Sequence, residues 1–332
     1  MTLRRVSIWA ASLIATALAT LAASSMASAA ENYPERPIRL IVPFPAGGIN
    51  DVLARLWADK ITPHLGTVIV ENRGGGGSMI GSAEAARAAP DGYTLLLGNS
   101  TNQVLNSQLM RSPPFDPAKD FTAVTILATI PNVIAVNPSL PVKTLKELAE
   151  HARANPGKLS YGSAGIGTMT HLSGELFKKL AGDLDIVHVP YRGGAPAIAD
   201  ITSGTLPVIS LSMAAQLLAL HRAGKIRILC VNASARAEVA PDIPTAVESG
   251  FPDMVVEVFN GIFAPAGTPK PIVDRISSAT KKIMTDPALQ KILKGAGAHI
   301  VVDSDPDKAT RFVTAERERW TPIINASGIP KR

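Results

Sequence analysis

The chain has 332 residues, of which 46% are hydrophobic and 18% charged, and its formal net charge is +6. A chain of this length can bury one or two hydrophobic cores. The charge is scattered and aromatic residues make up only 5%, which excludes the dense basic surface and the base-stacking platforms of a nucleic-acid-binding protein. A mild basic excess suits a small anionic ligand.

The N-terminus has the three parts of a secretory signal peptide. Arg4 and Arg5 come first, an apolar segment follows at about residues 8–21, and the small residues of 24–30 contain the cleavage motif Ala27-Ser28-Ala29. The apolar segment is too short for a membrane anchor, which needs ~20 residues. Only the arginine pair favours a twin-arginine route. We therefore expect residues 1–30 to be cleaved and the mature protein to be located in the periplasm.

The mature chain is expected to be a soluble monomer. Without Arg4 and Arg5 it has 31 basic and 27 acidic residues, so the formal charge falls to +4. The one cysteine, Cys230, lies in the apolar run Ile226–Val231 and is expected to be a buried strand residue. Because a single cysteine allows no intrachain disulfide, stability must come from packed cores.

Strand-like and helix-like segments alternate in the first part of the mature chain. Strands are predicted at Ile38–Phe44, Thr67–Val70 and Tyr93–Leu97. Between them, the segment Ser82–Ala89 is alanine-rich, and Asp51–Ile61 has helical periodicity. The apolar face of that helix comprises Val52, Leu53, Leu56, Trp57 and Ile61. This β-α-β-α-β order predicts a parallel sheet covered by helices on both faces.

A second unit begins after a break at Pro131. Its predicted helices are Thr144–Ala154, which opens with a capping box of Thr144 and Glu147, and Thr170–Leu180. The run Thr122–Ile130 precedes this unit, whose strands are predicted at Val133–Val136, Leu159–Ser163, Asp185–Tyr191, Leu206–Leu211 and Ile226–Val231. A strand predicted at Val255–Pro265 leads out of it. Three C-terminal helices follow, with start signals at Thr268-Pro269, Asp286-Pro287 and Asp305-Pro306.

Each unit has its own strands and its own glycine-rich turn, so we expect two α/β domains. The C-terminal helices have no strands of their own and are expected to cover the first domain. The first domain would then comprise residues 31–131 and 254–332, and the second residues 132–253. The chain would cross between the domains twice, near residues 130–132 and 256–263, and two crossings make a hinge.

The glycine-rich segments do not fit the nucleotide-binding motifs. No segment matches G-x-x-x-x-G-K-[ST], which excludes a P-loop. The cluster Gly74–Ser78 lacks the G-x-G-x-x-G spacing, because Met79 stands where the last glycine would be. We expect this cluster to form a tight strand-to-helix turn at the sheet edge, and we expect no cofactor.

Catalytic and metal chemistry has weak support in the sequence. Ser163 lies in YGSAG, where Tyr161 replaces the first glycine of a nucleophile elbow, and His171 is eight residues away. We expect His171 to cap or orient the adjacent turn. The six histidines are dispersed without metal-ligand spacing, so no metal site is predicted. A secreted hydrolase that uses Ser163 and His171 is the alternative to a binding protein.

Two glycine-rich turns stand between a strand and a helix at matching places in the two units. The first is Phe44-Pro45-Ala46-Gly47-Gly48, which Asn50-Asp51 connects to a helix, and the second is GSAGIGT at residues 162–168. Glycine lets backbone N–H groups approach an anion, and a helix N-terminus adds partial positive charge. Ligands of open α/β sheets bind at such strand ends. The turns therefore predict an anion-binding cleft.

Asp51 affects which kind of anion the predicted cleft could bind. Its carboxylate would repel a doubly charged phosphate, whereas a water-bridged carboxylate ligand, or one that carries an amine, would be tolerated. The other interpretation is that Asp51 only stabilises the helix start. Three or four charge-assisted hydrogen bonds, at about 1.5 to 3 kcal/mol each, can leave the roughly −8 kcal/mol of a micromolar receptor.

Seven segments, in order along essentially the whole mature chain, carry a family resemblance. They are YPERPIRLIVPFPAGG (33–48), PDGYTLLLGN (90–99), FDPAKDFTAV (115–124), PGKLSYGSAGIGTMTHLSGELF (156–177), HVPYRGGAPAIADI (188–201), PDIPTAVESGFP (241–252) and GIFAPAGTP (261–269). The chain resembles the periplasmic solute receptors of tripartite tricarboxylate transporters, also called Bug (Bordetella uptake gene) proteins. This resemblance implies a two-lobed α/β periplasmic-binding-protein (Venus flytrap) fold. It also implies a non-catalytic receptor that delivers a small carboxylate, amino acid or related compound to membrane transporter subunits.

In that family, backbone amides of the two turns hold one carboxylate, often with ordered waters. Carried over by position, the resemblance implies ligand-binding residues on both turns and after two further strands. They are Phe44, Ala46, Gly47 and Gly48 in the first turn, Ser163, Gly165, Gly167 and Thr168 in the second, and Ser100, Thr101 and the segment Tyr191–Gly194, with Tyr191 and Gly193 foremost, after the further strands. Ile49, Asn50 and Asp51 directly follow the first turn, and we expect them to bind the ligand as well.

The chain departs from the family pattern in two places. Ile49 and Asn50 stand where a third Gly and a Thr are usual, and Thr101–Met110 replaces the usual Asn-Pro-x-Leu-Tyr. Ile49 would narrow the cleft or make its edge apolar. The ligand therefore stays open among mono-, di- and tricarboxylates, aromatic acids and amino acids. A third interpretation is a ligand-sensing receptor, which would use the same cleft and contact a signalling partner.

Overall fold

The computed structural model describes residues 32–326, 329 and 331. The predicted signal peptide lies outside the described residues. Among these residues, no helix has both the length and the apolar character that crossing a bilayer requires.

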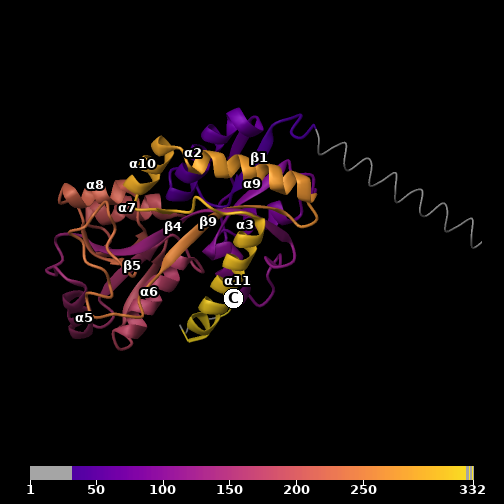
Figure 1. The fold of residues 1–332 in the computed structure, drawn as a ribbon. Coiled ribbons are helices and arrows are strands. Elements are labelled where there is room, and N and C mark those ends of the chain that lie inside the picture. Colours follow the sequence, from indigo (N-terminus) through magenta and orange to yellow (C-terminus); the bar gives the residue numbers. More distant parts are fainter. Residues whose placement is uncertain (1–31, 327–328, 330, 332) are drawn as a thin grey trace, which may run out of the picture.

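Strands and helices alternate along most of the chain (Figure 1). The elements are β1 (Ile38–Val42), α2 (Ile49–Leu65), β2 (Val68–Asn72), α3 (Met79–Ala86), β3 (Thr94–Asn99), the π-helical turn η1 (Thr101–Leu105), α4 (Asn106–Leu109), β4 (Phe121–Val136), α5 (Leu145–Ala154), β5 (Leu159–Ser163), α6 (Met169–Leu180), β6 (Ile186–Pro190), α7 (Gly194–Ser203), β7 (Val208–Ser212), α8 (Ala215–Arg222), β8 (Arg227–Asn232), β9 (Glu257–Pro265), α9 (Lys270–Met284), α10 (Pro287–Gly295), β10 (His299–Ile300) and α11 (Pro306–Ala326).

In the described chain, ten strands form a sheet of two parts that share the long strand β4. The first part has the order β2-β1-β3-β9-β4, with β10 also on β4, and the second part joins β4 to β7, β8, β5 and β6. Strands β1, β2 and β3 are parallel, as are β5, β6 and β7. The parallel arrangement predicted for the first unit is therefore confirmed for β1, β2 and β3, although β3 also pairs antiparallel with β9. Strands β4 and β9 carry the chain between the two parts in opposite directions, so they pair antiparallel.

The sequence predicted a break at Pro131, but the structure has no break there. Pro131 lies inside β4, which pairs with β9 before it and with β7 after it. The Pro131 carbonyl accepts a hydrogen bond from the Met213 N–H at 2.8 Å. The nitrogen of Pro131 thus faces the side on which the partner of β4 changes from β10 to β7. Because no ladder hydrogen bond is needed there, proline is tolerated within a long strand.

The helices gather on the two parts of the sheet and form two lobes (Figure 1). Helices α5 to α8 surround β5 in one lobe, and α2, α3 and α9 lie around β1 in the other. Helix α9 packs on α2, where the Trp57 indole Nε1–H donates to Thr280 Oγ1 at 3.1 Å. Helices α9 and α11 also pack on β4. The C-terminal helices therefore cover the first part of the sheet.

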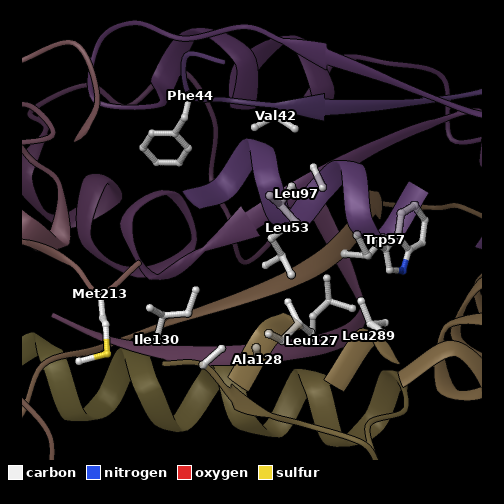
Figure 2. Packing of buried hydrophobic residues seen from close by; sticks show 14 of the residues in the cluster. Val42, Phe44, Leu53, Trp57, Leu97, Leu127, Ala128, Ile130, Met213 and Leu289 are labelled. Atoms are coloured by element: carbon white, nitrogen blue, oxygen red, sulfur yellow. The ribbon is translucent and has the colours of Figure 1, made fainter. Parts of the chain in front are cut away.

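Helix α2 begins at Ile49, two residues before the predicted start. Leu53, Trp57 and Ile61 are buried, as the periodicity predicted. Figure 2 shows Leu53 and Leu97 in the middle of this packing, with Leu127 of β4 nearby. Val52 was assigned to the same face, but its side chain is 45% exposed. The apolar face of this helix is wide, so only part of it packs on the core, and Val52 lies on the part that does not.

Local start signals are confirmed in several helices. Thr144 caps α5 by accepting from the Glu147 N–H at 3.1 Å. Asp286 caps α10 by accepting from the Ala288 N–H at 2.7 Å. The glycine cluster joins the edge strand β2 to α3, with Gly75, Gly76 and Gly77 at positive φ. Such backbone angles favour glycine, which explains the cluster without a ligand.

Cys230 lies within β8 and is completely buried. Burial raises the pKa of its thiol to about 12, so the thiol stays protonated at neutral pH. The prediction of a buried strand residue is confirmed.

Candidate functional site

A cavity of about 240 Å³ is lined by residues of both lobes, a volume that suits a single small molecule. From the first lobe it is lined by Phe44–Asn50, Val52, Leu53, Leu56, Asn99, Thr101, Ile130, Val258, Asn260, Ile292, Leu293, Ala296 and Ala298. From the second lobe it is lined by Ala164, Thr168–Thr170, Arg192–Pro196, Ile198, Leu211, Ser212 and Ala214–Gln216.

The first predicted turn lies on the cavity wall, but its Gly47 amide is already engaged. Gly47 has a φ of 83°, and its N–H donates to Asp51 Oδ2 at 2.9 Å. Asn50 Oδ1 accepts from the Asn99 side chain at 3.4 Å. In the described chain, the N–H groups of Ile49 and Asn50 have no protein acceptor. The N–H groups of Ala46 and Gly48 likewise have no acceptor among the described residues, so the turn offers a ligand its own amides as well as those at the start of α2.

Asp51 does not line the cavity. Its side chain is buried, and Oδ1 pairs with the Arg55 guanidinium at 3.0 Å. Burial raises the pKa of this carboxyl, but the hydrogen bonds from Arg55 and from the Gly47 N–H outweigh burial and lower it overall. Asp51 is thus ionised at neutral pH and holds the first turn against α2. This geometry favours the interpretation of Asp51 as a stabiliser of the helix start.

The second glycine-rich turn is hydrogen-bonded within itself. The Gly165 N–H donates to Ser163 Oγ at 3.2 Å, and the Gly167 N–H donates to His171 Nδ1 at 3.2 Å. The Ala164 N–H donates to Thr170 Oγ1 at 3.0 Å. Ser163, Gly165 and Gly167 do not line the cavity, whereas Thr168 does. The expected role of His171 in orienting this turn is confirmed by its bond to Gly167.

The Ser163 hydroxyl is paired with a different histidine from the one in the hydrolase hypothesis. Ser163 Oγ lies 2.7 Å from His188 Nε2, and the His188 ring stacks on His171 with centroids 4.0 Å apart. Burial, together with His171, lowers the pKa of His188 to about 3. Such a histidine is a weak general base at neutral pH. Because Ser163 is also completely buried, the cluster has the geometry of a structural core.

Ser100 and Tyr191 lie behind the cavity wall, whereas Thr101 lines it. Ser100 Oγ accepts from the Phe259 N–H at 3.0 Å, and the Tyr191 hydroxyl donates to Asp200 Oδ2 at 2.6 Å. Thr101 Oγ1 accepts from the Met169 N–H at 3.1 Å. This last bond joins the two lobes at the cavity.

Gly193 brings the two lobes into direct contact. Its φ is 104°, and a Cβ atom at this position would lie 3.2 Å from Cδ and Cγ of Pro45. The neighbouring Arg192 also lines the cavity. Arg192 is the only charged residue among the described residues that line it, and none of them provides an ionic partner for its guanidinium.

Four helix N-termini meet at the cavity. The N-cap residues Gly48 of α2, Thr168 of α6, Gly193 of α7 and Ala214 of α8 all line it. A helix N-terminus presents unpaired N–H donors and partial positive charge. Together with Arg192, the four ends make the cavity electropositive, with no acidic side chain among the described residues of its wall. An electropositive cavity of this kind is suited to a small anion.

Sequence reasoning did not single out several cavity residues. Arg192 lay in the segment Tyr191–Gly194 that was expected to line the cavity, but its charge was given no role, and the start of α8 carried no motif. Asn260 lines the cavity and is 1% exposed, and its Oδ1 has no hydrogen-bond partner in the described chain. Helix α10 was expected only to cover the first lobe, yet Ile292 and Leu293 line the cavity. Ile292 follows the buried Leu289 by three residues on one face of α10, so the sequence pattern did not distinguish it from a core residue.

The described residues hold no cluster of three or more His, Cys, Asp or Glu side chains that could bind a metal ion. The cavity donors are backbone amides, hydroxyls, amides of side chains and one guanidinium. Such donors bind and orient an anion.

Comparison with known proteins identifies relatives along most of the chain. The family model described as tripartite tricarboxylate transporter family receptor matches residues 53–329. A UPF0065 protein of Bordetella pertussis is 37% identical over 318 residues, which cover 95% of this chain and 96% of that protein. The structure of Rhodopseudomonas palustris Rpa4515 with adipate has a TM-score of 0.86 at 33% identity, covering 90% of this chain and 99% of that chain. MatC from Rhodopseudomonas palustris, with bound malate, has a TM-score of 0.83 at 30% identity, covering 88% and 100%.

These matches span most of the chain, and the periplasmic binding protein BugD also shares the fold, with a TM-score of 0.85 at 33% identity. The predicted two-lobed periplasmic-binding-protein fold is confirmed. The chain belongs to the tripartite tricarboxylate transporter receptor family.

Proposed function

We propose that this protein is an extracytoplasmic receptor that captures a small carboxylate between its lobes and delivers it to the membrane subunits of a tripartite tricarboxylate-type transporter. The observation that carries the proposal is the meeting of four helix N-termini with Arg192 at one cavity. Each helix end favours a negative charge, and a guanidinium can bind a carboxylate through two parallel hydrogen bonds. Relatives with adipate and malate support a carboxylate as the anion.

Several donors on the wall are suited to a carboxylate. The N–H groups of Ile49 and Asn50 have no acceptor in the described chain, and Asn260 has an unpaired amide oxygen there. The Asn260 NH₂ group already donates to the Val258 carbonyl at 3.3 Å, so its Oδ1 is an acceptor for a hydroxyl or amine of the ligand or for an ordered water. Hydrogen bonds of this kind, at about 1.5 to 3 kcal/mol each, supply part of the roughly −8 kcal/mol of a micromolar receptor, and the Arg192 guanidinium supplies more.

The predicted domains and hinge belong to the same proposal. Residues 31–131 and 254–332 would move as one lobe and residues 132–253 as the other. The pairing of Pro131 in β4 with Glu257 in β9 supports two neighbouring chain crossings. Export by cleavage of residues 1–30, a monomeric state and the absence of catalysis are further parts of the proposal.

The binding function is tested by thermal-shift screening against mono-, di- and tricarboxylates, aromatic acids and amino acids, since a ligand raises stability by mass action. Calorimetry on the best ligand then compares Arg192→Gln with Arg87→Gln, an exposed arginine away from the cavity. We expect Arg192→Gln to weaken binding about tenfold, which is ~1.4 kcal/mol, and Arg87→Gln to change nothing. Failure of every acid to shift the melting temperature would overturn the function.

Delivery is tested in cells that lack the chromosomal gene. Uptake of the identified acid should be lost, and restored by the parent protein but not by Arg192→Gln. Normal uptake without the gene would refute delivery while leaving binding intact. Mass spectrometry of the ligand after incubation with the protein checks the absence of catalysis, because an altered ligand would support an enzyme instead.

A further inference from the structure

The cavity is chemically different at its two ends. The N-cap residues of α2, α6, α7 and α8 define a polar end, to which Arg192 adds the charge. Val52 and Leu56 of α2 continue the wall about one and two helical turns from the N-terminus of that helix. Beside them, Ile292 and Leu293 of α10 and Ala296, which follows this helix, line the cavity. The second end is thus entirely apolar.

Helix α10 is held in place beside α2. The Lys60 ammonium of α2 pairs with the Asp286 carboxylate at the start of α10, at 2.8 Å. Leu289 and Leu293 are buried against the core of the first lobe. After α10, Gly297 packs directly against the Met213 side chain of the second lobe. Figure 2 shows Met213 beside Ile130 at this junction, and Figure 1 shows α10 next to α7. The apolar wall therefore spans from α2 toward the second lobe.

Two apolar side chains of this wall are unusually exposed to solvent. Val52 is 45% exposed and Ile292 is 47% exposed. Both line the cavity, so a ligand with an apolar body would remove their surface from water. A polar ligand held at the helix N-termini would leave the two side chains solvated. Contact with this wall therefore strengthens the binding of a ligand that has apolar atoms.

The apolar end also disfavours a ligand that carries a second charged group far from the first. The cavity wall carries one cationic side chain among the described residues, and it lies at the start of α7. A carboxylate near Val52 and Ile292 would find no charged partner among those residues and would have to give up its hydration, which is unfavourable. The wall thus distinguishes an acid with one charged end from an acid with two.

We propose that the ligand is a monocarboxylate with an apolar aromatic or branched aliphatic body, with its carboxylate at Arg192 and the helix N-termini and its body on the wall formed by α2 and α10. This inference rests on the proposed carboxylate-binding function and adds the class of acid. Ile292 is the specificity-determining residue that the structure singles out, because it is open to the cavity and lies on the helix that completes the wall.

Calorimetry with four probes tests the class: phenylacetate and 4-methylpentanoate against succinate and citrate. We expect the two monocarboxylates to bind at least tenfold more tightly than the two polar acids. We expect Ile292→Ser to weaken binding of phenylacetate about tenfold, a typical effect of removing apolar contact from a pocket, and to leave succinate unchanged. Ile69→Ser is the matched control, because Ile69 is also 47% exposed but does not line the cavity.

The outcomes distinguish a failure of this inference from a failure of the proposed function on which it rests. Tighter binding of succinate or citrate than of both monocarboxylates would overturn the inference and keep the carboxylate receptor. An equal effect of Ile292→Ser and Ile69→Ser on phenylacetate would overturn the role of the wall. Binding of none of the four acids would overturn the inference, whereas the function itself is overturned only if the whole thermal-shift screen finds no ligand. Melting curves of each variant without ligand show that the fold is retained.

Discussion

Replacing Gly193 by alanine tests the backbone at the junction of the two lobes. Gly193 has a φ of 104° and a ψ of 174°, a conformation that is essentially restricted to glycine. An alanine held there stores roughly 1 to 3 kcal/mol of strain. At roughly 2 to 4 °C per kcal/mol, Gly193→Ala should lower the melting temperature by roughly 2 to 12 °C. Differential scanning calorimetry measures this shift directly.

The same substitution at the next residue, Gly194, provides the control. Gly194 begins α7 with a helical backbone, and a Cβ atom there would contact only the Leu211 side chain, at an ordinary 3.8 Å. Gly194→Ala should therefore raise stability by about 0.4 to 1 kcal/mol, because alanine restricts the unfolded chain. Equal melting temperatures for the two variants would refute the strain argument. The new Cβ of Gly193→Ala would also press on Pro45 across the cavity, so we expect weaker ligand binding in that variant.

Two further predictions concern the walls of the site. Asp51→Asn should be less stable than the parent at pH 7: the lowered pKa of Asp51 means that its ionised form stabilises the fold above the unfolded pKa of about 3.9, and this contribution is lost as pH falls through the folded pKa. Urea unfolding at pH 7 and pH 3 checks this, and a difference that persists undiminished at pH 3 would contradict it. Thr101→Val should lower the unfolding free energy by about 1 to 3 kcal/mol, because the buried Met169 N–H loses its acceptor. Thr101→Ser keeps the hydroxyl and should restore most of that loss in the same urea titration.

Helix starts and turns could be predicted from the sequence because their causes are local. Thr144 and Asp286 cap their helices with side-chain oxygens that lie within three residues of the N–H groups they accept from. The two glycine turns were placed correctly between strand and helix for the same reason. What the sequence could not predict was the acceptor of each amide. Whether the Gly47 N–H faces Asp51 or a ligand depends on packing that no local pattern contains.

The cavity was harder to predict because an apolar binding wall and a core have the same periodicity. Val52 and Leu53 are neighbours in one helical stripe, yet Val52 is open to the cavity and Leu53 is buried. Ile292 has the same ambiguity on α10. Arg192 became significant only when folding placed it among four helix N-termini, on a wall whose described residues offer it no ionic partner. Such convergence of distant segments has no signature at a single position.

The internal hydrogen bonds of the second glycine-rich turn have a kinetic consequence. Because Ala164, Gly165 and Gly167 already donate within the lobe, the turn has its shape before any ligand arrives. Binding then has little chain entropy to remove there, and preorganisation of this kind strengthens association without adding a contact. The rate of capture should accordingly be set by diffusion and by the approach of the two lobes, and not by the ordering of this loop.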